Sequence, residues 1–170
     1  GDTCELDLYS ARETVTISPS IARLYPTVVI PDTELHKMFL QGRYCPMQQE
    51  DAIIRTAAMY RILDSAGINI IRVGLKSSDI INGKNMQAGT FHPAFRQLVE
   101  GKIAQEDLDI QLRGCKPNTS VCCVSHPDSF NNMIGHKAVN KKYFSSAYPD
   151  LRISYKADGN MRKGTYSIKF

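Results

Sequence analysis

The sequence has no tryptophan, no apolar run of about 18 residues and no C-x-x-C pair among its five cysteines. Without a long apolar run, no segment is expected to span a membrane. Without C-x-x-C spacing, a structural zinc site is not expected. The chain also begins without a basic head followed by an apolar stretch, so we expect no signal peptide and a cytoplasmic protein.

The cysteines are odd in number and scattered along the chain, which favours reduced thiols over a disulfide framework. They are Cys4, Cys45, Cys115, Cys122 and Cys123. The adjacent pair Cys122 and Cys123 would point to opposite faces of a strand and could not easily bind one ion. We therefore predict no metal site, and we expect the thiols to be buried and inert.

Charge is distributed unevenly over a chain whose composition is globular, with 42% hydrophobic and 22% charged residues. Residues 1–114 carry 12 basic and 14 acidic side chains, whereas residues 115–170 carry 9 basic and 3 acidic ones. A segment as basic as this favours a polyanionic partner, because released counterions drive such binding. The alternative is a solvated surface that keeps the protein soluble.

The first 75 residues predict an α/β arrangement. The expected helices are 5–17, 33–40 and 48–66, and the expected strands are 21–30 and 68–75. Both strands are nearly continuous apolar runs, which indicates strands of a parallel sheet buried on both faces. A strand, a long helix and a second strand form a βαβ unit. Two parallel strands leave both sheet edges open, so we expect this sheet to be incomplete.

The remaining segments divide the chain further. Residues 76–91 are turn-rich and predict a loop, and a helix is expected from His92 to about Arg113. Residues 114–119 are the expected boundary. We therefore predict three parts, which are residues 1–76, 77–113 and 114–170.

The last part predicts strands at 120–125, 151–156 and 165–170, and helices at 127–134 and 139–147. The helices flank the turn Gly135-His136-Lys137-Ala138. This order and turn resemble the KH nucleic-acid-binding fold, in which a G-x-x-G turn lets a phosphate backbone approach closely. Here Ala138 stands at the fourth position. The resemblance implies RNA contacts at Gly135, His136, Lys137, Ala138, Lys141 and Lys142. The alternative is a small α+β element in which Gly135 merely ends a helix.

Most of residues 1–113 resembles a second family. The resemblance is carried by Tyr25-Pro26-Thr27, Ile71-Arg72-Val73-Gly74-Leu75 and Phe91-His92-Pro93-Ala94-Phe95. These motifs are similar to the C-terminal half of bacterial radical-SAM proteins related to the Elongator catalytic subunit. The resemblance implies an incomplete (β/α) barrel whose parent protein uses S-adenosylmethionine and a 4Fe–4S cluster. The cluster motif C-x-x-x-C-x-x-C is absent, so we expect residues 1–170 to bind neither cofactor and to be inactive alone.

The same resemblance implies roles for residues near the mouth of the barrel. It places Tyr25, Thr27 and Thr33 as cofactor contacts, and Arg72 and His92 as catalytic residues. Thr33 is also well placed to cap a helix. Arg72 lies in an apolar strand, where it needs an ion-pair partner. That partner would be a carboxylate of the missing N-terminal half or of a ligand.

Together these inferences predict the C-terminal portion of a radical-SAM enzyme that modifies tRNA or another RNA. It would supply a barrel wall and an RNA-docking surface, and its other partner would be the missing N-terminal half. Two alternatives stay open. One is a stand-alone RNA-binding module, and the other is part of a radical-SAM oxidase for a small molecule of the porphyrin type.

Overall fold

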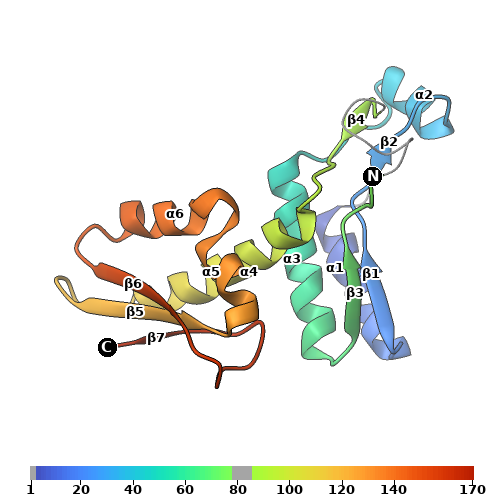
Figure 1. The fold of residues 1–170 in the computed structure, drawn as a ribbon. Coiled ribbons are helices and arrows are strands. Elements are labelled where there is room, and N and C mark those ends of the chain that lie inside the picture. Colours follow the sequence, from blue (N-terminus) through green and yellow to red (C-terminus); the bar gives the residue numbers. More distant parts are fainter. Residues whose placement is uncertain (1–2, 78–85) are drawn as a thin grey trace. The chain divides into compact units, whose positions relative to one another are not determined.

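The computed structural model describes residues 3–77 and 86–170, and the chain divides into two compact units, residues 1–99 and 100–170 (Figure 1). The long helix α4, Phe95–Leu112, contributes its first residues to the first unit and the rest to the second. Both units mix helices with a small sheet, so the predicted α/β class is confirmed.

The first unit is built on a parallel pair of strands, β1 (Ile21–Leu24) and β3 (Asn69–Val73). Helix α3 (Gln49–Ser65) comes between them in sequence and packs on both strands, and α1 (Cys4–Ile17) packs on α3 (Figure 1). The parallel pairing confirms the strand–helix–strand unit expected from the sequence. Within the described residues this sheet has two strands.

Local chemistry sets the ends of these helices. The Thr3 hydroxyl accepts a hydrogen bond from the Leu6 amide at 3.3 Å and so caps the start of α1. Beyond the end of α3, Gly67 adopts φ +77°, the left-handed conformation predicted for the residue after that helix. An ion pair of 3.2 Å between Asp7 and Arg55 joins α1 to α3.

The prediction of one strand over residues 21–30 was wrong. Strand β1 stops at Leu24, two residues before Pro26, which has no amide hydrogen to donate to a ladder. The chain then forms a short second strand, β2 (Val28–Val29), which pairs antiparallel with β4 (Ala88–Gly89). Helix α2 (Glu34–Leu40) follows β2.

Strand β4 lies inside the segment 76–91 that was expected to be a loop. Residues 78–85 of that expected loop lie outside the described residues. At the pairing, Gly89 adopts φ +98°, and a Cβ there would lie 2.9 Å from the Thr27 carbonyl oxygen. Only glycine allows the two backbones to approach this closely.

The expectation that β1 and β3 are buried on both faces was also wrong. One face, with Leu24 and Val73, is buried at 7% and 6% exposure. On the opposite face, Ile21 is 53% exposed and Ile71 is 41% exposed. Apolar side chains thus occupy both faces of this sheet, but residues 3–77 and 86–170 cover only one of them.

The second unit has a three-stranded sheet in the order β6-β5-β7, with β5 (Ser120–Ser125) in the centre. Strand β6 (Arg152–Ala157) runs parallel to β5, and β7 (Tyr166–Lys169) runs antiparallel. Between β5 and β6 the chain forms η1 (Pro127–Ser129), α5 (Phe130–Ile134), η2 (His136–Ala138) and α6 (Val139–Ala147). The predicted succession of one strand, two helices and two strands is present.

The core of this unit forms between the sheet and its helices. Its completely or almost completely buried side chains include Leu108, Val121, Cys123, Met133 and Phe144. Burial raises the pKa of the Cys123 thiol to about 12, which leaves it protonated and unreactive near neutral pH. Cys122 is partly exposed, consistent with adjacent cysteines on opposite faces of β5.

Gln111 of α4 covers the outer edge of β7. Its amide nitrogen donates to the Tyr166 carbonyl at 3.1 Å, and its amide oxygen accepts from the Ile168 amide at 3.1 Å. The Gln111 side chain thus satisfies one carbonyl and one amide of β7, as the backbone of a neighbouring strand would. An open strand edge invites pairing with other chains, and here α4 occupies this one.

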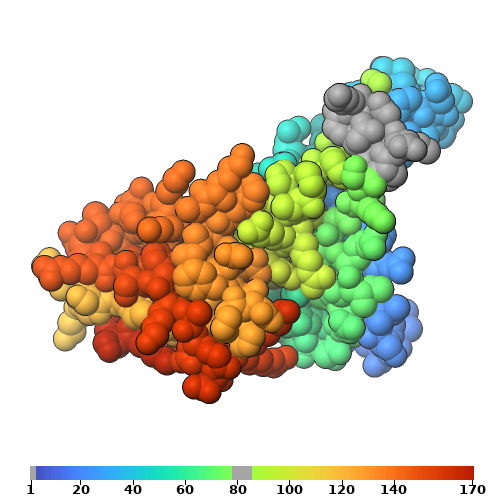
Figure 2. Space-filling model, in the orientation of Figure 1, coloured from blue at the N-terminus to red at the C-terminus, as the bar shows by residue number. Residues whose placement is uncertain are grey.

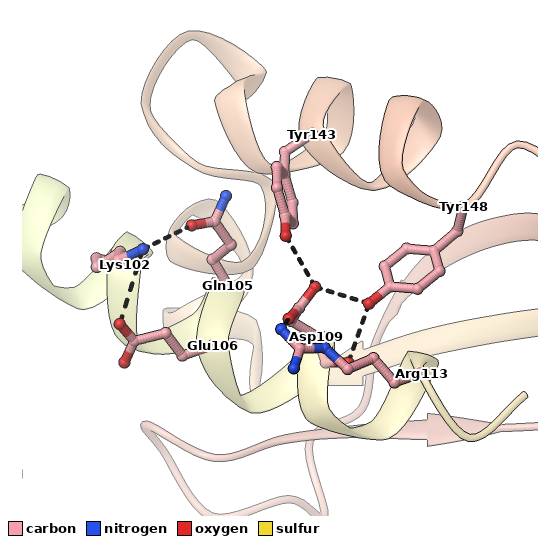
Figure 3. A network of polar contacts seen from close by, with 7 residues as sticks. All are labelled: Lys102, Gln105, Glu106, Asp109, Arg113, Tyr143 and Tyr148. Carbon is pink, nitrogen blue, oxygen red and sulfur yellow. Dashed lines mark hydrogen bonds and ion pairs between the residues drawn. The ribbon is translucent and has the colours of Figure 1, made fainter.

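A polar cluster around Asp109 joins α4 to α6 (Figure 3). The nearly buried Asp109 carboxylate accepts from the hydroxyls of Tyr148 at 2.7 Å and Tyr143 at 2.9 Å, and from the Arg113 guanidinium. Burial alone would raise the pKa of Asp109, but the hydrogen bonds from Tyr148, Tyr143 and Arg113 outweigh it and hold that pKa below its ordinary value. Burial and the bond to Asp109 raise the pKa of Tyr148 to about 12.

The cluster predicts a pH-dependent stability. Because the pKa of Asp109 is lower in the folded state, its contribution is complete above the unfolded-state pKa of about 4 and is lost as the pH falls through the folded-state pKa. Asp109→Asn should lower the free energy of unfolding at pH 7 by roughly 1–3 kcal/mol. The difference from the unmodified protein should shrink as the pH falls below about 4.

Chemical denaturation at a series of pH values measures this difference. The control is Asp150→Asn, which removes an exposed carboxylate and should change stability by less than about 0.5 kcal/mol. A stability difference for Asp109→Asn that stays constant down to low pH would contradict the role given to the carboxylate.

Candidate nucleic-acid interface

The turn predicted to contact RNA joins α5 to α6 in the second unit. Gly135 ends α5 with φ +81° and ψ 155°, and the third and fourth residues of the turn, Lys137 and Ala138, have φ values of +53° and +61°. A residue with a Cβ is strained in the left-handed region by roughly 1–2 kcal/mol. The turn therefore holds two residues in an unfavourable conformation, and the surrounding structure must fix them there.

Gly135 is required by a close approach as well as by its conformation. A Cβ at this position would lie 2.8 Å from the Asn140 amide nitrogen, 2.9 Å from Asn140 Cγ and 2.9 Å from Val139 Cγ1. The end of α5 thus lies directly against the first turn of α6. The absence of a side chain at Gly135 makes this contact possible.

Asn140 holds the turn in place, and its role was not anticipated from the sequence. Asn140 is 2% exposed, and its side-chain amide nitrogen donates to the carbonyls of Gly101 at 2.8 Å and Asn132 at 3.1 Å. A longer bond of 3.4 Å reaches the Met133 carbonyl. One buried amide therefore connects α6 to the end of α5 and to α4, and an isolated sequence gives little signal for it beyond a polar residue in the first turn of a helix.

The first turn of α6 has the features of an anion site. The helix has no side-chain cap at Ala138 and no acidic residue in its first turn. No side chain of this turn therefore offsets the partial positive charge at the start of the helix. Lys137, Lys141 and Lys142 surround this end and are all exposed. Figure 2 shows α6, coloured orange, at the surface of the molecule.

The ammonium groups of these three lysines make no hydrogen bond or ion pair in the part of the chain that the structure describes. By contrast, Lys163 and Lys169 are each paired with an aspartate, at 3.4 Å and 2.7 Å. Unpaired ammonium groups beside a helix start without a side-chain cap can bind phosphate without first breaking an ion pair.

The residues predicted for catalysis and cofactor binding lie in the first unit. The Thr33 hydroxyl accepts from the His36 amide at 3.2 Å and donates to the Ile30 carbonyl at 2.8 Å, so it caps α2. His92 Nδ1 accepts from the Ala94 amide at 3.0 Å, which fixes the ring at the start of α4. Thr33 and His92 thus both have structural contacts.

The other three residues are exposed. Arg72 lies on β3, Tyr25 follows β1 and is 46% exposed, and Thr27 precedes β2. Their side chains make no hydrogen bond with another group among the described residues. They are therefore available to a ligand, whereas the Thr33 hydroxyl is already used by the helix cap.

The described residues do not provide ligands for an iron–sulfur cluster. No group of three or more His, Cys, Asp or Glu side chains gathers in residues 3–77 and 86–170. The expectation that the thiols are buried was wrong for Cys4 and Cys45, which are exposed, and it holds for Cys123. In the same residues, no helix is both long enough and apolar enough to cross a bilayer.

The geometry of the turn predicts a large effect of a single methyl group. Gly135→Ala should lower the free energy of unfolding by roughly 2–4 kcal/mol, because the new Cβ meets the backbone of α6 and alanine does not tolerate this φ and ψ. Thermal or urea unfolding of the chain measures it.

The control is Gly159→Ala, where a Cβ would have no neighbour within 4 Å and the change should be less than about 0.5 kcal/mol. Equal effects of the two glycine-to-alanine exchanges would refute the close approach.

The reverse exchange, Ala138→Gly, should raise the free energy of unfolding by up to about 1 kcal/mol, because glycine adopts the left-handed conformation of this position without strain.

Comparison with known protein families identifies most of the first unit and the start of the second. The family model described as "Radical_SAM C-terminal domain" matches residues 19–105, which is just over half of the chain. No curated protein and no solved structure matches the chain. The matched residues include β1, α3, β3 and the beginning of α4, and exclude the turn at Gly135. The chain therefore belongs to the radical-SAM C-terminal domain family.

Proposed function

We propose that this chain is the C-terminal part of a radical-SAM enzyme that modifies RNA, with tRNA as the substrate class. In this proposal the turn between α5 and α6 docks the phosphate backbone of the RNA. The first unit contributes part of the wall of a (β/α) barrel. The family match supports the enzyme class, and the basic second unit supports the nucleic-acid substrate.

The observation that carries the proposal is the set of lysines without partners in the described chain at the start of α6, which has no side-chain cap. Lys137, Lys141 and Lys142 are exposed without an acidic partner in the described chain, and residues 115–170 have an excess of basic side chains. Each phosphate contact releases counterions and makes binding salt-dependent. A KH-like turn uses the same elements, namely a glycine, a helix start and flanking positive charge.

The barrel assignment is supported by the parallel strands and their single covered face. In a (β/α) barrel the helices cover the outside, and the other face of the strands lines the interior. Arg72, with Tyr25 and Thr27, would then face the reaction chamber, as would His92 at the start of α4. S-adenosylmethionine and the iron–sulfur cluster implied by the family would be bound chiefly by other parts of the parent enzyme.

The small-molecule alternative has less support. The second unit has a pocket of about 140 Å³, lined among others by Leu112, Cys115, Tyr148 and Leu151. Sites for drug-sized ligands usually measure about 300–1,000 Å³. This pocket is too small for a molecule as large as a porphyrin, so a substrate of that kind would have to bind in the first unit, where the reaction chamber is proposed.

Charge reversal at the turn tests the proposal. Lys137→Glu together with Lys141→Glu should weaken tRNA binding roughly 10- to 100-fold, and the slope of log affinity against log salt should fall by about 2. Fluorescence anisotropy with labelled tRNA at several salt concentrations measures both quantities.

A matched control reverses two exposed charges in the first unit, Arg12→Glu with Lys76→Glu, and changes the net charge by the same amount. It should retain most of the affinity. Equal losses for the two double variants would show that only net charge matters. Absence of tRNA binding by the unmodified chain at low salt would overturn the proposal and favour a small-molecule substrate.

A further inference from the structure

A β-bulge interrupts the pairing of β1 with β3 in the first unit. Ala22 pairs with Ile70, but the next residue of β1, Arg23, pairs with Arg72. Ile71 is therefore an additional residue on β3. Such insertions turn the side chains that follow them to the other face of the sheet, and they are frequent next to active sites.

The bulge places two arginines side by side on the open face. In a regular register Arg23 would pair with Ile71, and Arg72 would pair with Leu24, whose side chain is buried in the core. With the extra residue, Leu24 pairs with the buried Val73, while Arg72 joins Arg23 on the exposed face. The irregularity keeps the core intact and brings the two guanidinium-bearing residues together.

Among the described residues, these two arginines have no acidic partner to offset their charge. Both are exposed, and neither makes an ion pair or hydrogen bond through its side chain within residues 3–77 and 86–170. Like charges directly opposite each other on a sheet are destabilising. Elsewhere in the described chain, Arg55 and Arg113 are each paired with an aspartate.

The position of the pair also favours a ligand. Arg23 and Arg72 are each the second-to-last residue of a parallel strand. Ligands of α/β proteins bind at the carboxyl ends of parallel strands. A guanidinium group presents a planar set of donors that matches the two oxygens of a carboxylate or phosphate.

We propose that the guanidinium groups of Arg23 and Arg72 together bind one oxyanion, the carboxylate or phosphate group of a ligand at this end of the sheet. The site uses residues of the first unit alone. Its failure would therefore leave the RNA-docking proposal for the second unit untouched, and failure of RNA docking would not affect this site.

NMR signals of the arginine side chains test the proposal directly. The Nε–H resonances of the ¹⁵N-labelled chain are recorded during titration with inorganic phosphate, and separately with acetate, at constant ionic strength. The signals of Arg23 and Arg72 should shift together and saturate with one dissociation constant. The signal of Arg12, exposed on α1, should change only slightly and without saturation.

Substitutions make the test specific. Arg72→Gln should abolish the saturable shift of Arg23, Arg72→Lys should weaken it several-fold, and Arg12→Gln should leave it unchanged. A response to phosphate alone would identify a phosphate ligand, and a response to acetate would identify a carboxylate; both support the site. Shifts at Arg23 and Arg72 that stay as small and linear as those of Arg12 with both ions would overturn it.

Stability gives a second readout in case the affinity is low. In chloride buffer Arg72→Gln should melt at the same temperature as the unmodified chain or higher, because it removes a like-charge contact. The favoured anion should raise the melting temperature of the unmodified chain but not of Arg72→Gln. A lower melting temperature for Arg72→Gln with no dependence on either anion would mean that Arg72 has a structural role, and would overturn the proposal.

Discussion

The buried side-chain amide of Asn140 is the interaction on which the second unit depends. Its hydrogen bonds reach the carbonyls of Gly101 and Asn132, which belong to α4 and α5, while Asn140 itself is in α6. A neutral amide can donate two hydrogen bonds without bringing a charge into the interior. This bonding fixes the start of α6 against Gly135 and so determines where the three exposed lysines lie.

The two units differ in whether the polar side chains discussed above have partners. In the second unit the edge of β7 is satisfied by Gln111, and the Asp109 carboxylate is surrounded by hydroxyl and guanidinium donors. In the first unit, Arg23 and Arg72 lie together on a sheet face that also exposes Ile21 and Ile71. Stability alone explains the arrangement around Asp109 and Gln111. It does not explain two adjacent arginines that have no acidic partner among the described residues, and we therefore propose that they bind a ligand.

Several parts of this fold could be predicted from the sequence because the signals were local. Helical spacing and Gly67 defined α3 almost to the residue, and the turn at Gly135 was recognised from its glycine and flanking helices. The strand over residues 21–30 was misjudged because a run of apolar residues outweighed Pro26, which ends β1. Burial on both faces was misjudged because apolar composition does not reveal which face other elements cover.

The missed site residues depend on contacts between distant segments. Asn140 acts through Gly101, which is 39 positions away in the sequence. Arg23 meets Arg72 only because a bulge shifts the register by one residue, and no sequence pattern marks that bulge. Ala138 departs from the expected glycine of the turn, yet it adopts a left-handed conformation all the same.

Mapping the surface that tRNA contacts would test the central claim most directly. Backbone amide signals of the ¹⁵N-labelled chain are compared before and after addition of tRNA at low salt. The account predicts that the largest shifts or losses of intensity fall on residues 135–142, at the turn and the first part of α6. Unchanged signals there, with the strongest effects on the first unit or on β6 and β7, would contradict it.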